Sequence, residues 1–369
     1  MLTRVEIANY RGFESYRMAG LAQLNLLVGR NNTGKTALLE GIQFLTSGGD
    51  PAVLAEAAER RGELIVVGRE PSFNQMVDIA HFFHGHTLAL DTSISFTGDN
   101  GYAPVTVKAI AQKNGRADAA SAHPPQAESV SFFLKITGPH GRERKAGAMF
   151  PISREGGVNL DVPPRFRRAG VSRSADGPQV RFVGSESVNS IQLAIMWDDV
   201  TTSGQEADVA AAMRVLEPKL ESVHPLTGMF ASGYFPSRGG FVVGLKDQEP
   251  RLPLGSMGDG MRRLMALATS LAFTKNGCLF VDEIDTGLHY SVMPDMWELV
   301  IKKAVASNIQ VFATTHSWDC IEGLCLLGER EPGLVSKATI HKIDRAIPHS
   351  VAFSGGAIVR MVKSDIDPR

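Results

Sequence analysis

Residues 29–36, with the sequence Gly-Arg-Asn-Asn-Thr-Gly-Lys-Thr, have the residue types and spacing of a phosphate-binding loop, or P-loop. Gly29 and Gly34 permit backbone turns and a close approach of ligand that a Cβ would obstruct. Backbone N–H groups in such a loop direct partial positive charge at a polyphosphate. Lys35 is expected to reach the β- and γ-phosphates, and Thr36 to offer its hydroxyl to Mg²⁺. The predicted nucleotide-binding residues here are Gly29, Asn31, Asn32, Thr33, Gly34, Lys35, Thr36 and Ala37.

The residues on both sides of the loop place it between a strand and a helix. Residues 24–28 form a short apolar run typical of a buried parallel strand, and residues 37–45 carry apolar side chains at helical spacing. A P-loop binds phosphate in this context of strand, glycine loop and helix. The sequence therefore predicts a nucleotide-binding protein with an α/β fold.

Two later strands end in residues that suit nucleotide hydrolysis. The apolar run 278–281 is followed by Asp282 and Glu283, in the form of a Walker B motif. Asp282 is expected to hold Mg²⁺ and Glu283 to polarise the attacking water. The apolar run 309–315 is followed by His316, which at a strand end can donate to the γ-phosphate. The alternative interpretation of His316 is a histidine of the core.

A second candidate anion site lies at residues 254–260, before a helix predicted from Met261 to Phe273. Ser256 lies near the expected N-cap, and glycines such as Gly258 leave backbone N–H groups exposed. One bound nucleotide needs only one P-loop, so a second anion site has no use for the nucleotide of its own chain. We therefore expect this segment to close over ATP that is bound by a second, head-to-tail copy of the chain.

In their order, these motifs resemble ATPases of the ABC class, in the branch of RecF, the SMC heads and the OLD-type proteins. The segments 7–13 and 286–289 are similar to that branch as well. The resemblance implies an ATPase that uses Mg²⁺ and ATP in an ATP-sandwich homodimer. It implies that Ser256 and Gly258 contact the partner's nucleotide, that residues 285–289 are the D-loop, and that His316 is the switch histidine. No Q-loop glutamine can be assigned, although Gln75 and Gln126 are candidates.

The expected fold is therefore α/β: an ABC-type P-loop NTPase with a mixed sheet and an inserted α+β lobe. The core is predicted from residues 1–50 and 246–369, and the lobe from residues 51–245. Polar stretches near residues 111–129 and 161–178 are expected to be flexible loops. Residues 207–223 have the pattern of an amphipathic helix, in which Pro218 predicts a kink or an earlier end near Glu217. Residues 357–362 have the pattern of a closing strand.

Charge and composition leave several functions open. The net charge of −1 gives no general attraction to nucleic acid, but residues 142–181 hold nine basic and four acidic side chains. Arg165, Arg167 and Arg168 in this segment contact DNA or an acidic partner, or else form a solvated loop. The tail after His316 is short for the TOPRIM domain of OLD-type nucleases, which favours a separate nuclease or effector protein. A DNA-binding module of recombination-mediator type and a regulatory ATPase without nucleic-acid contact are the alternatives.

The remaining features predict a cytoplasmic protein that does not enter a membrane. The chain has three cysteines, an odd number in apolar or helical stretches, as expected of reduced thiols. No apolar run approaches the roughly 20 residues of a membrane helix. His81, His84 and His86 lie close together but lack the usual accompanying ligands, so packing is preferred over metal binding.

Overall fold

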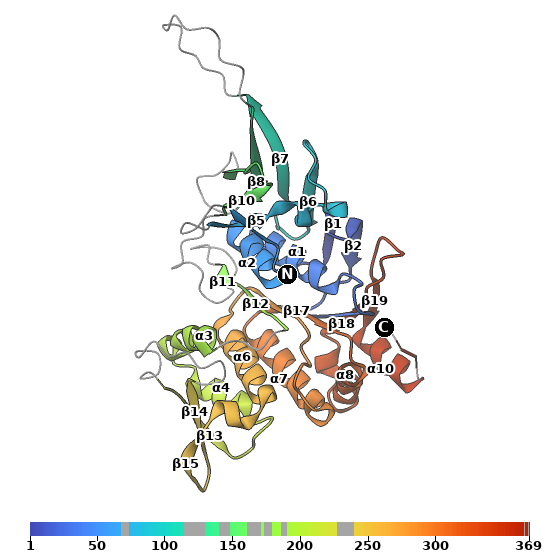
Figure 1. Ribbon diagram of the computed structural model, residues 1–369. Coiled ribbons are helices and arrows are strands. Elements are labelled where there is room, and N and C mark those ends of the chain that lie inside the picture. Colours follow the sequence, from blue (N-terminus) through green and yellow to red (C-terminus); the bar gives the residue numbers. More distant parts are fainter. Residues whose placement is uncertain are drawn as a thin grey trace, which may run out of the picture. The chain divides into compact units, whose positions relative to one another are not determined.

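The computed structural model describes residues 1–67, 74–113, 130–139, 148–160, 171–172, 179–185, 190–226, 240–364, 366–367 and 369 (Figure 1). The chain divides into two compact units. The first comprises Met1–Arg4, Met18–Leu39 and Pro164–Arg369, and the second comprises Val5–Arg17 and Glu40–Pro163. One boundary falls inside helix α1 (Lys35–Thr46).

The first unit is built on a seven-stranded mixed sheet with the order β11-β12-β16-β17-β3-β18-β19. The five inner strands are parallel and the two edge strands antiparallel to their neighbours. This sheet confirms the predicted α/β fold. The strands are β11 (Val171–Ser172), β12 (Val180–Val183), β16 (Cys278–Val281), β17 (Gln310–Thr315), β3 (Leu24–Val28), β18 (Ala338–Lys342) and β19 (Val351–Ser354).

The three strands that precede the predicted motifs are neighbours in this sheet. Every residue of β16, β17 and β3 is buried, as expected of parallel strands covered on both faces. Val281 pairs with Ala313, and Thr315 pairs with Val28. The carboxyl ends of parallel strands meet at one edge of a sheet. The P-loop, Asp282-Glu283 and His316 therefore start from adjacent positions.

Helices α6, α7, α8 and α10 pack against this sheet in a shared hydrophobic core (Figure 1). Trp297 of α7 is fully buried there, and its indole Nε1 donates to the Cys320 carbonyl of α8 at 2.8 Å. The helices are α6 (Asp259–Phe273), α7 (Met293–Ala306), α8 (Trp318–Arg330) and α10 (Gly355–Lys363), with short helices η4 (Tyr290–Val292) and α9 (Pro332–Val335).

The prediction of a strand at residues 357–362 is wrong, because these residues belong to α10. Ile358 and Val362 lie one helical turn apart and both pack against the core. The strand that closes the sheet is β19, which pairs with β18.

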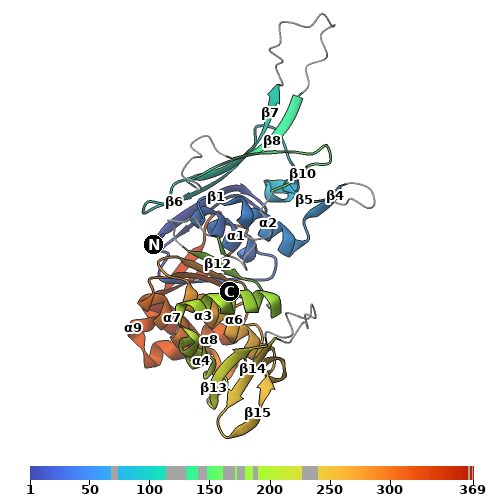
Figure 2. The ribbon, with the colours of Figure 1, turned by 90° about the vertical axis from the view of Figure 1, so that its left-hand side faces the viewer.

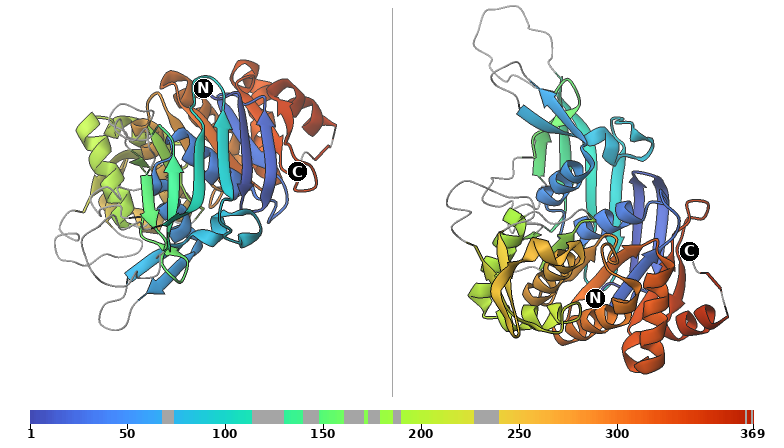
Figure 3. Two further views of the ribbon diagram at one scale, coloured as in Figure 1. Left: turned by 90° about the horizontal axis from the view of Figure 1, so that it is seen from above. Right: turned by 60° about the horizontal axis from the view of Figure 1, so that its bottom comes forward.

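A second layer of the first unit covers α6 from another side (Figure 3). It contains α3 (Ser190–Ser203), α4 (Glu206–Met213) and the sheet of β13 (Leu220–Pro225), β14 (Phe241–Leu245) and β15 (Gln248–Pro253), followed by η3 (Leu254–Met257). Met261, Met265 and Ala268 of α6 belong to this second cluster. Because α6 is covered on two sides, nearly all of its residues are buried.

The helix expected over residues 207–223 ends before Pro218, which is the earlier end that this proline allowed, but the helical assignment of residues 220–223 is wrong. Helix α4 ends at Met213, and residues 220–225 form β13, which pairs with β14. Pro218 lies between the two elements and cannot continue a helix. Leu220 and Val223 are buried in the strand, so their apolar side chains do not mark a helical face.

The second unit holds a six-stranded sheet with the order β2-β1-β6-β7-β8-β9 and a small sheet β10-β5-β4. β7 and β8 pair antiparallel along most of their length (Figure 2). The strands are β1 (Arg4–Tyr10), β2 (Phe13–Ala19), β4 (Leu64–Val67), β5 (Asn74–Asp78), β6 (Ser93–Gly98), β7 (Val105–Lys113), β8 (Val130–Thr137), β9 (Ala148–Pro151) and β10 (Gly157–Val158).

This unit also contains helix α2 (Pro51–Arg61) and the short helices η1 (Ile79–Phe82) and η2 (His84–His86). Asp50 caps α2 by accepting from the Ala52 N–H, and Gly62 ends it in the left-handed conformation.

The units are divided at positions other than the expected boundaries 50 and 245. Residues after Pro163 join the P-loop unit because β12 pairs with β16. Residues 111–113, expected in a loop, extend β7, whereas most of the two predicted loops lies outside the described residues.

Candidate functional site

The P-loop backbone adopts conformations that favour glycine. Gly29 has a φ of +147°, and a Cβ added there would lie 2.7 Å from the Ile343 carbonyl oxygen. Gly34 has a φ of +96°, and Asn32 is left-handed with a φ of +61°. A side chain at Gly29 or Gly34 would be strained, which explains the two glycines of the motif. Helix α1 begins directly after them, at Lys35.

The Lys35 ammonium group lies within the loop. Its Nζ donates to the carbonyl oxygens of Gly29 and Arg30, both at 2.8 Å. Burial lowers the pKa of Lys35, while the nearby charges of Asp282 and Glu283 act in the opposite direction. A partly desolvated ammonium at this position is suited to a phosphate oxygen.

Thr36 and Asp282 come together although they are far apart in sequence. The Thr36 Oγ1 lies 3.1 Å from both carboxylate oxygens of Asp282. Thr314 donates from its Oγ1 to Asp282 Oδ1 at 2.6 Å. A hydroxyl and a carboxylate oxygen side by side are ligands that Mg²⁺ prefers, so the residues present fit this ion.

Glu283 lies beside His316 at the neighbouring strand end. Glu283 Oε1 is 3.6 Å from His316 Nδ1, and Oε2 accepts from the Thr286 hydroxyl at 3.4 Å. The side chains of Glu283 and His316 are 40% and 50% exposed, so both are accessible to solvent. The interpretation of His316 as a core histidine therefore does not apply.

Ser256 and Gly258 lie at a different place, where η3 leads into α6. Both are exposed, and Gly258 has a φ of +90°. No side chain caps the N-terminus of α6. The first turn of α6 contacts the predicted D-loop, because a Cβ on Gly260 would lie 2.4 Å from the Gly287 carbonyl oxygen. The start of α6 and the D-loop are thus adjacent within one chain.

The structure adds three residues to which the sequence assigned no role. Thr314 bonds Asp282 and accepts from the Glu283 N–H at 2.8 Å. Thr315 donates to Asp285 Oδ1 at 2.6 Å. Arg263 of α6 donates to the carbonyls of Asp282 and Glu283. The available signal for Arg263 was a basic residue in the apolar stretch 261–273.

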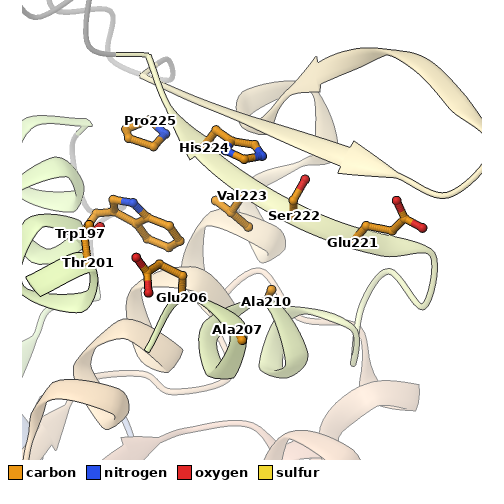
Figure 4. Close-up of a pocket in the computed structure, with 10 residues that line it drawn as sticks. All are labelled: Trp197, Thr201, Glu206, Ala207, Ala210, Glu221, Ser222, Val223, His224 and Pro225. Atoms are coloured by element: carbon orange, nitrogen blue, oxygen red, sulfur yellow. The ribbon is translucent and has the colours of Figure 1, made fainter. Parts of the chain in front are cut away.

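A pocket of about 390 Å³ lies between α3, α4 and β13 in the first unit (Figure 4). Trp197, Glu206 and His224 are among its lining residues. None of the lining residues belongs to the predicted nucleotide site, so the pocket and the strand ends that carry the motifs are built from different residues.

Several other residues singled out in the sequence lie outside the described residues or in the second unit. Arg165, Arg167 and Arg168 lie outside the described residues, as does Gln126, while Gln75 belongs to β5 in the second unit. In the described ranges no three His, Cys, Asp or Glu side chains are grouped to hold a metal. His84 instead contacts the Arg11 carbonyl. The helices within the described part of the chain include none long and apolar enough to cross a membrane.

Comparison with known proteins assigns the family. A model described as "AAA domain, putative AbiEii toxin, Type IV TA system" matches residues 124–319, more than half of the chain. The chain belongs to this AAA family. A second model, "AAA ATPase domain", matches residues 1–142, which include the P-loop. The protein is thus an AAA-family P-loop ATPase, as the motifs predicted.

Individual relatives are distant. An "ATP/GTP phosphatase" of Helicobacter pylori is 22% identical over 341 residues, 87% of each chain. An uncharacterized protein of Methanocaldococcus jannaschii is 32% identical over 68 residues, 18% of this chain and 60% of its own.

Among solved structures, an SMC head bound to the C-winged helix domain of ScpA is 14% identical with a TM-score of 0.48, covering 96% of this chain and 98% of its own. The SMC head of Thermotoga maritima is 13% identical with a TM-score of 0.41, at the same coverage. Because both similarities are weak, the fold assignment rests on the observed sheet and on the family.

Proposed function

We propose that this AAA-family ATPase works by nucleotide-dependent closure of a head-to-tail homodimer. Each P-loop holds ATP, and the start of α6 from the other subunit covers it. Hydrolysis then reopens the dimer. The exposed, uncapped N-terminus of α6, beside Ser256 and Gly258, is the observation that supports this arrangement. A helix N-terminus of this kind presents backbone N–H groups to an anion.

The residues at the three strand ends have complementary roles in this proposal. Lys35 binds the β- and γ-phosphates, and Asn31, Asn32, Thr33 and Ala37 complete the P-loop around them. Thr36 and Asp282 hold Mg²⁺, which would neutralise developing phosphate charge. Glu283 accepts a proton from the attacking water as the water oxygen bonds to the γ-phosphorus. The bond to ADP breaks and inorganic phosphate is released, while His316 contacts the γ-phosphate.

The head-to-tail arrangement is tested by mixing two inactive variants. Ser256→Arg blocks the covering surface, and Lys35→Ala removes phosphate binding. We expect each variant alone to have at least about 100-fold lower ATPase activity than the wild type. In Ser256→Arg every site lacks the covering surface, and in Lys35→Ala every site lacks the P-loop lysine. Their mixture forms heterodimers with one intact site. In that site the Ser256→Arg chain supplies an unchanged P-loop, and the Lys35→Ala chain supplies an unchanged covering surface. ATPase activity measured against mixing ratio should therefore rise well above either variant.

The matched control is a mixture of Lys35→Ala with the doubly substituted Ser256→Arg/Lys35→Ala chain, which has no intact P-loop and should stay inactive. Ser256 is exposed, so its substitution leaves the core packing unchanged. If mixing the two single variants restores no activity although both still associate, the site does not form in trans.

We further propose that the ATPase serves a separate effector or nuclease in a defence or DNA-processing system. The family description names a toxin of a type IV toxin–antitoxin system, which supports a role in such a two-component system. The relative in Helicobacter pylori is named an ATP/GTP phosphatase, so GTP should be compared with ATP as substrate.

Direct DNA binding is the second candidate function, favoured by the excess of basic residues in the segment 142–181. Replacing Arg165, Arg167 and Arg168 together by alanine removes three positive charges. If the segment binds DNA, affinity should fall about tenfold or more, and its salt dependence should weaken. Fluorescence anisotropy with labelled duplex DNA at two salt concentrations measures both. Unchanged affinity and salt slope would exclude this segment as the DNA contact.

A further inference from the structure

We infer that Arg263 is a positioning residue that holds the turn carrying Glu283 and ties this turn to the helix beginning at Ser256–Gly258. The first part of the inference needs only the contacts of one chain. The second part, a link to the partner's nucleotide, rests on the proposed head-to-tail dimer.

The Arg263 guanidinium joins the ends of two neighbouring strands. Its Nη2 donates to the carbonyl of Asp282 at 2.5 Å and to that of Glu283 at 3.1 Å. Its Nη1 donates to the carbonyl of Gly184, the residue after β12. A planar guanidinium with five donors can serve three carbonyls at once, whereas a lysine ammonium cannot match this fork.

Placing a positive charge here is costly, which argues for a specific use. Arg263 is 6% exposed, and burial lowers the pKa of its guanidinium. Asp282, Asp285 and Glu283 oppose this shift through their charges. Within the described part of the chain, its hydrogen bonds go to carbonyls and it forms no ion pair within 4.0 Å. An apolar side chain would pack at this position without the cost of desolvation.

The conformation of Glu283 explains why the turn needs support. Its φ is +48°, a left-handed conformation that is unfavourable for a residue with a Cβ. Three contacts to its backbone hold it there: Thr314 Oγ1 accepts from the Glu283 N–H, and the Glu283 carbonyl accepts from Arg263 and from the Thr286 N–H. Losing Arg263 would leave the Glu283 carbonyl only its bond within the turn and would free the Asp282 and Gly184 carbonyls, so the carboxylate could leave its position beside His316.

Arg263 also connects this turn to the proposed covering surface. It lies on α6 about one turn after Gly258, and the start of α6 packs on the D-loop residue Gly287. A shift of α6 when the partner's nucleotide docks at its N-terminus would move the guanidinium and the Glu283 turn together. Glu283 would then reach its working position only in the closed dimer.

The test compares Arg263→Ala with the wild-type chain in three measurements: kcat, ATP affinity and thermal unfolding. We expect kcat to fall about 100-fold, as for a displaced catalytic group, with ATP affinity changed less than about threefold. Added methylguanidinium should restore at least about tenfold in kcat, because it refills the space and the donors. A structural role alone would not produce this rescue.

Arg181→Ala is the matched control. Arg181 of β12 is 1% exposed, bonds Asp199 at 2.9 Å and lies over the ring of Phe273, the last residue of α6, so it also packs on α6 but at the end opposite to Ser256 and Gly258. We expect a lower Tm without a selective loss of kcat or a rescue of kcat by methylguanidinium. A normal kcat for Arg263→Ala would overturn the inference. It would also be overturned if methylguanidinium restores no activity and the loss of kcat only matches the fraction of protein that is unfolded.

A second variant covers the case in which Arg263→Ala does not fold. Arg263→Lys keeps the charge and most of the volume but not the fork. Low kcat with normal ATP affinity supports the positioning role, and wild-type kcat overturns it. Light scattering tests the proposed dimer independently of Arg263. If the wild-type chain hydrolyses ATP as a monomer, the dimer is refuted, but the effect of Arg263 substitutions on kcat can still be measured.

Discussion

Lys35→Ala is expected to lower the affinity for ATP by at least about 100-fold. The variant loses charge-assisted hydrogen bonds to the β- and γ-phosphates, worth on the order of 3 kcal/mol or more in total. The free protein should remain folded, because Nζ bonds only the loop carbonyls of Gly29 and Arg30 among the described contacts. Equilibrium binding of a fluorescent ATP analogue with Mg²⁺ measures the loss, and thermal unfolding without nucleotide checks the fold.

Lys302→Ala is the matched control for this experiment. Lys302 lies on the surface of α7 and pairs with Glu298 one turn away, so its removal should leave ATP affinity unchanged. Binding of ATP by Lys35→Ala within about threefold of wild type would mean that the loop at residues 29–36 does not hold the phosphates.

Glu283→Gln is expected to reduce kcat by about 100-fold or more while ATP affinity is retained. The amide cannot accept the proton of the attacking water, and general-base groups contribute on this scale. Glutamine is close in size to glutamate, so the contact with Thr286 and the packing around the turn are preserved. Because bound ATP persists, the closed dimer should accumulate. Light scattering with and without Mg-ATP should show a doubling of mass.

Glu298→Gln on the surface of α7 controls for the loss of a carboxylate and should behave as wild type. Normal ATP hydrolysis by Glu283→Gln would show that another group positions the water. If the molecular mass of the variant does not change with ATP although radiolabelled nucleotide is bound, the protein does not dimerise in response to nucleotide. Ser256 would then lose its proposed role.

The site was accessible to sequence analysis because its residues lie in short, local patterns. A glycine loop after an apolar run specifies both its strand and its helix, and the structure has β3 and α1 at those positions. Asp282, Glu283 and His316 each follow a fully buried strand. Only the rule that parallel strands end at a common edge was needed to bring them together.

The wrong predictions arose where the same local pattern fits two structures. Leu220 and Val223 fit a helical face but form β13, because β14 is available to pair with them. Residues 357–362 fit a short strand but form α10, because Ile358 and Val362 pack into the core under the main sheet. In both regions the neighbours that decide the outcome are distant in sequence.

The amino-acid sequence predicts a P-loop, a Walker B strand end and a histidine at the end of another strand. These follow from local backbone chemistry and from the shared direction of parallel strands. The groups that hold these residues in place are set by the packing of distant segments. Arg263 and Thr314 meet at the Glu283 turn because α6 and β17 pack beside β16, and no local pattern in the sequence records such a contact. Hydrogen bonds between distant segments depend on how those segments pack, so they become visible only when the chain is folded.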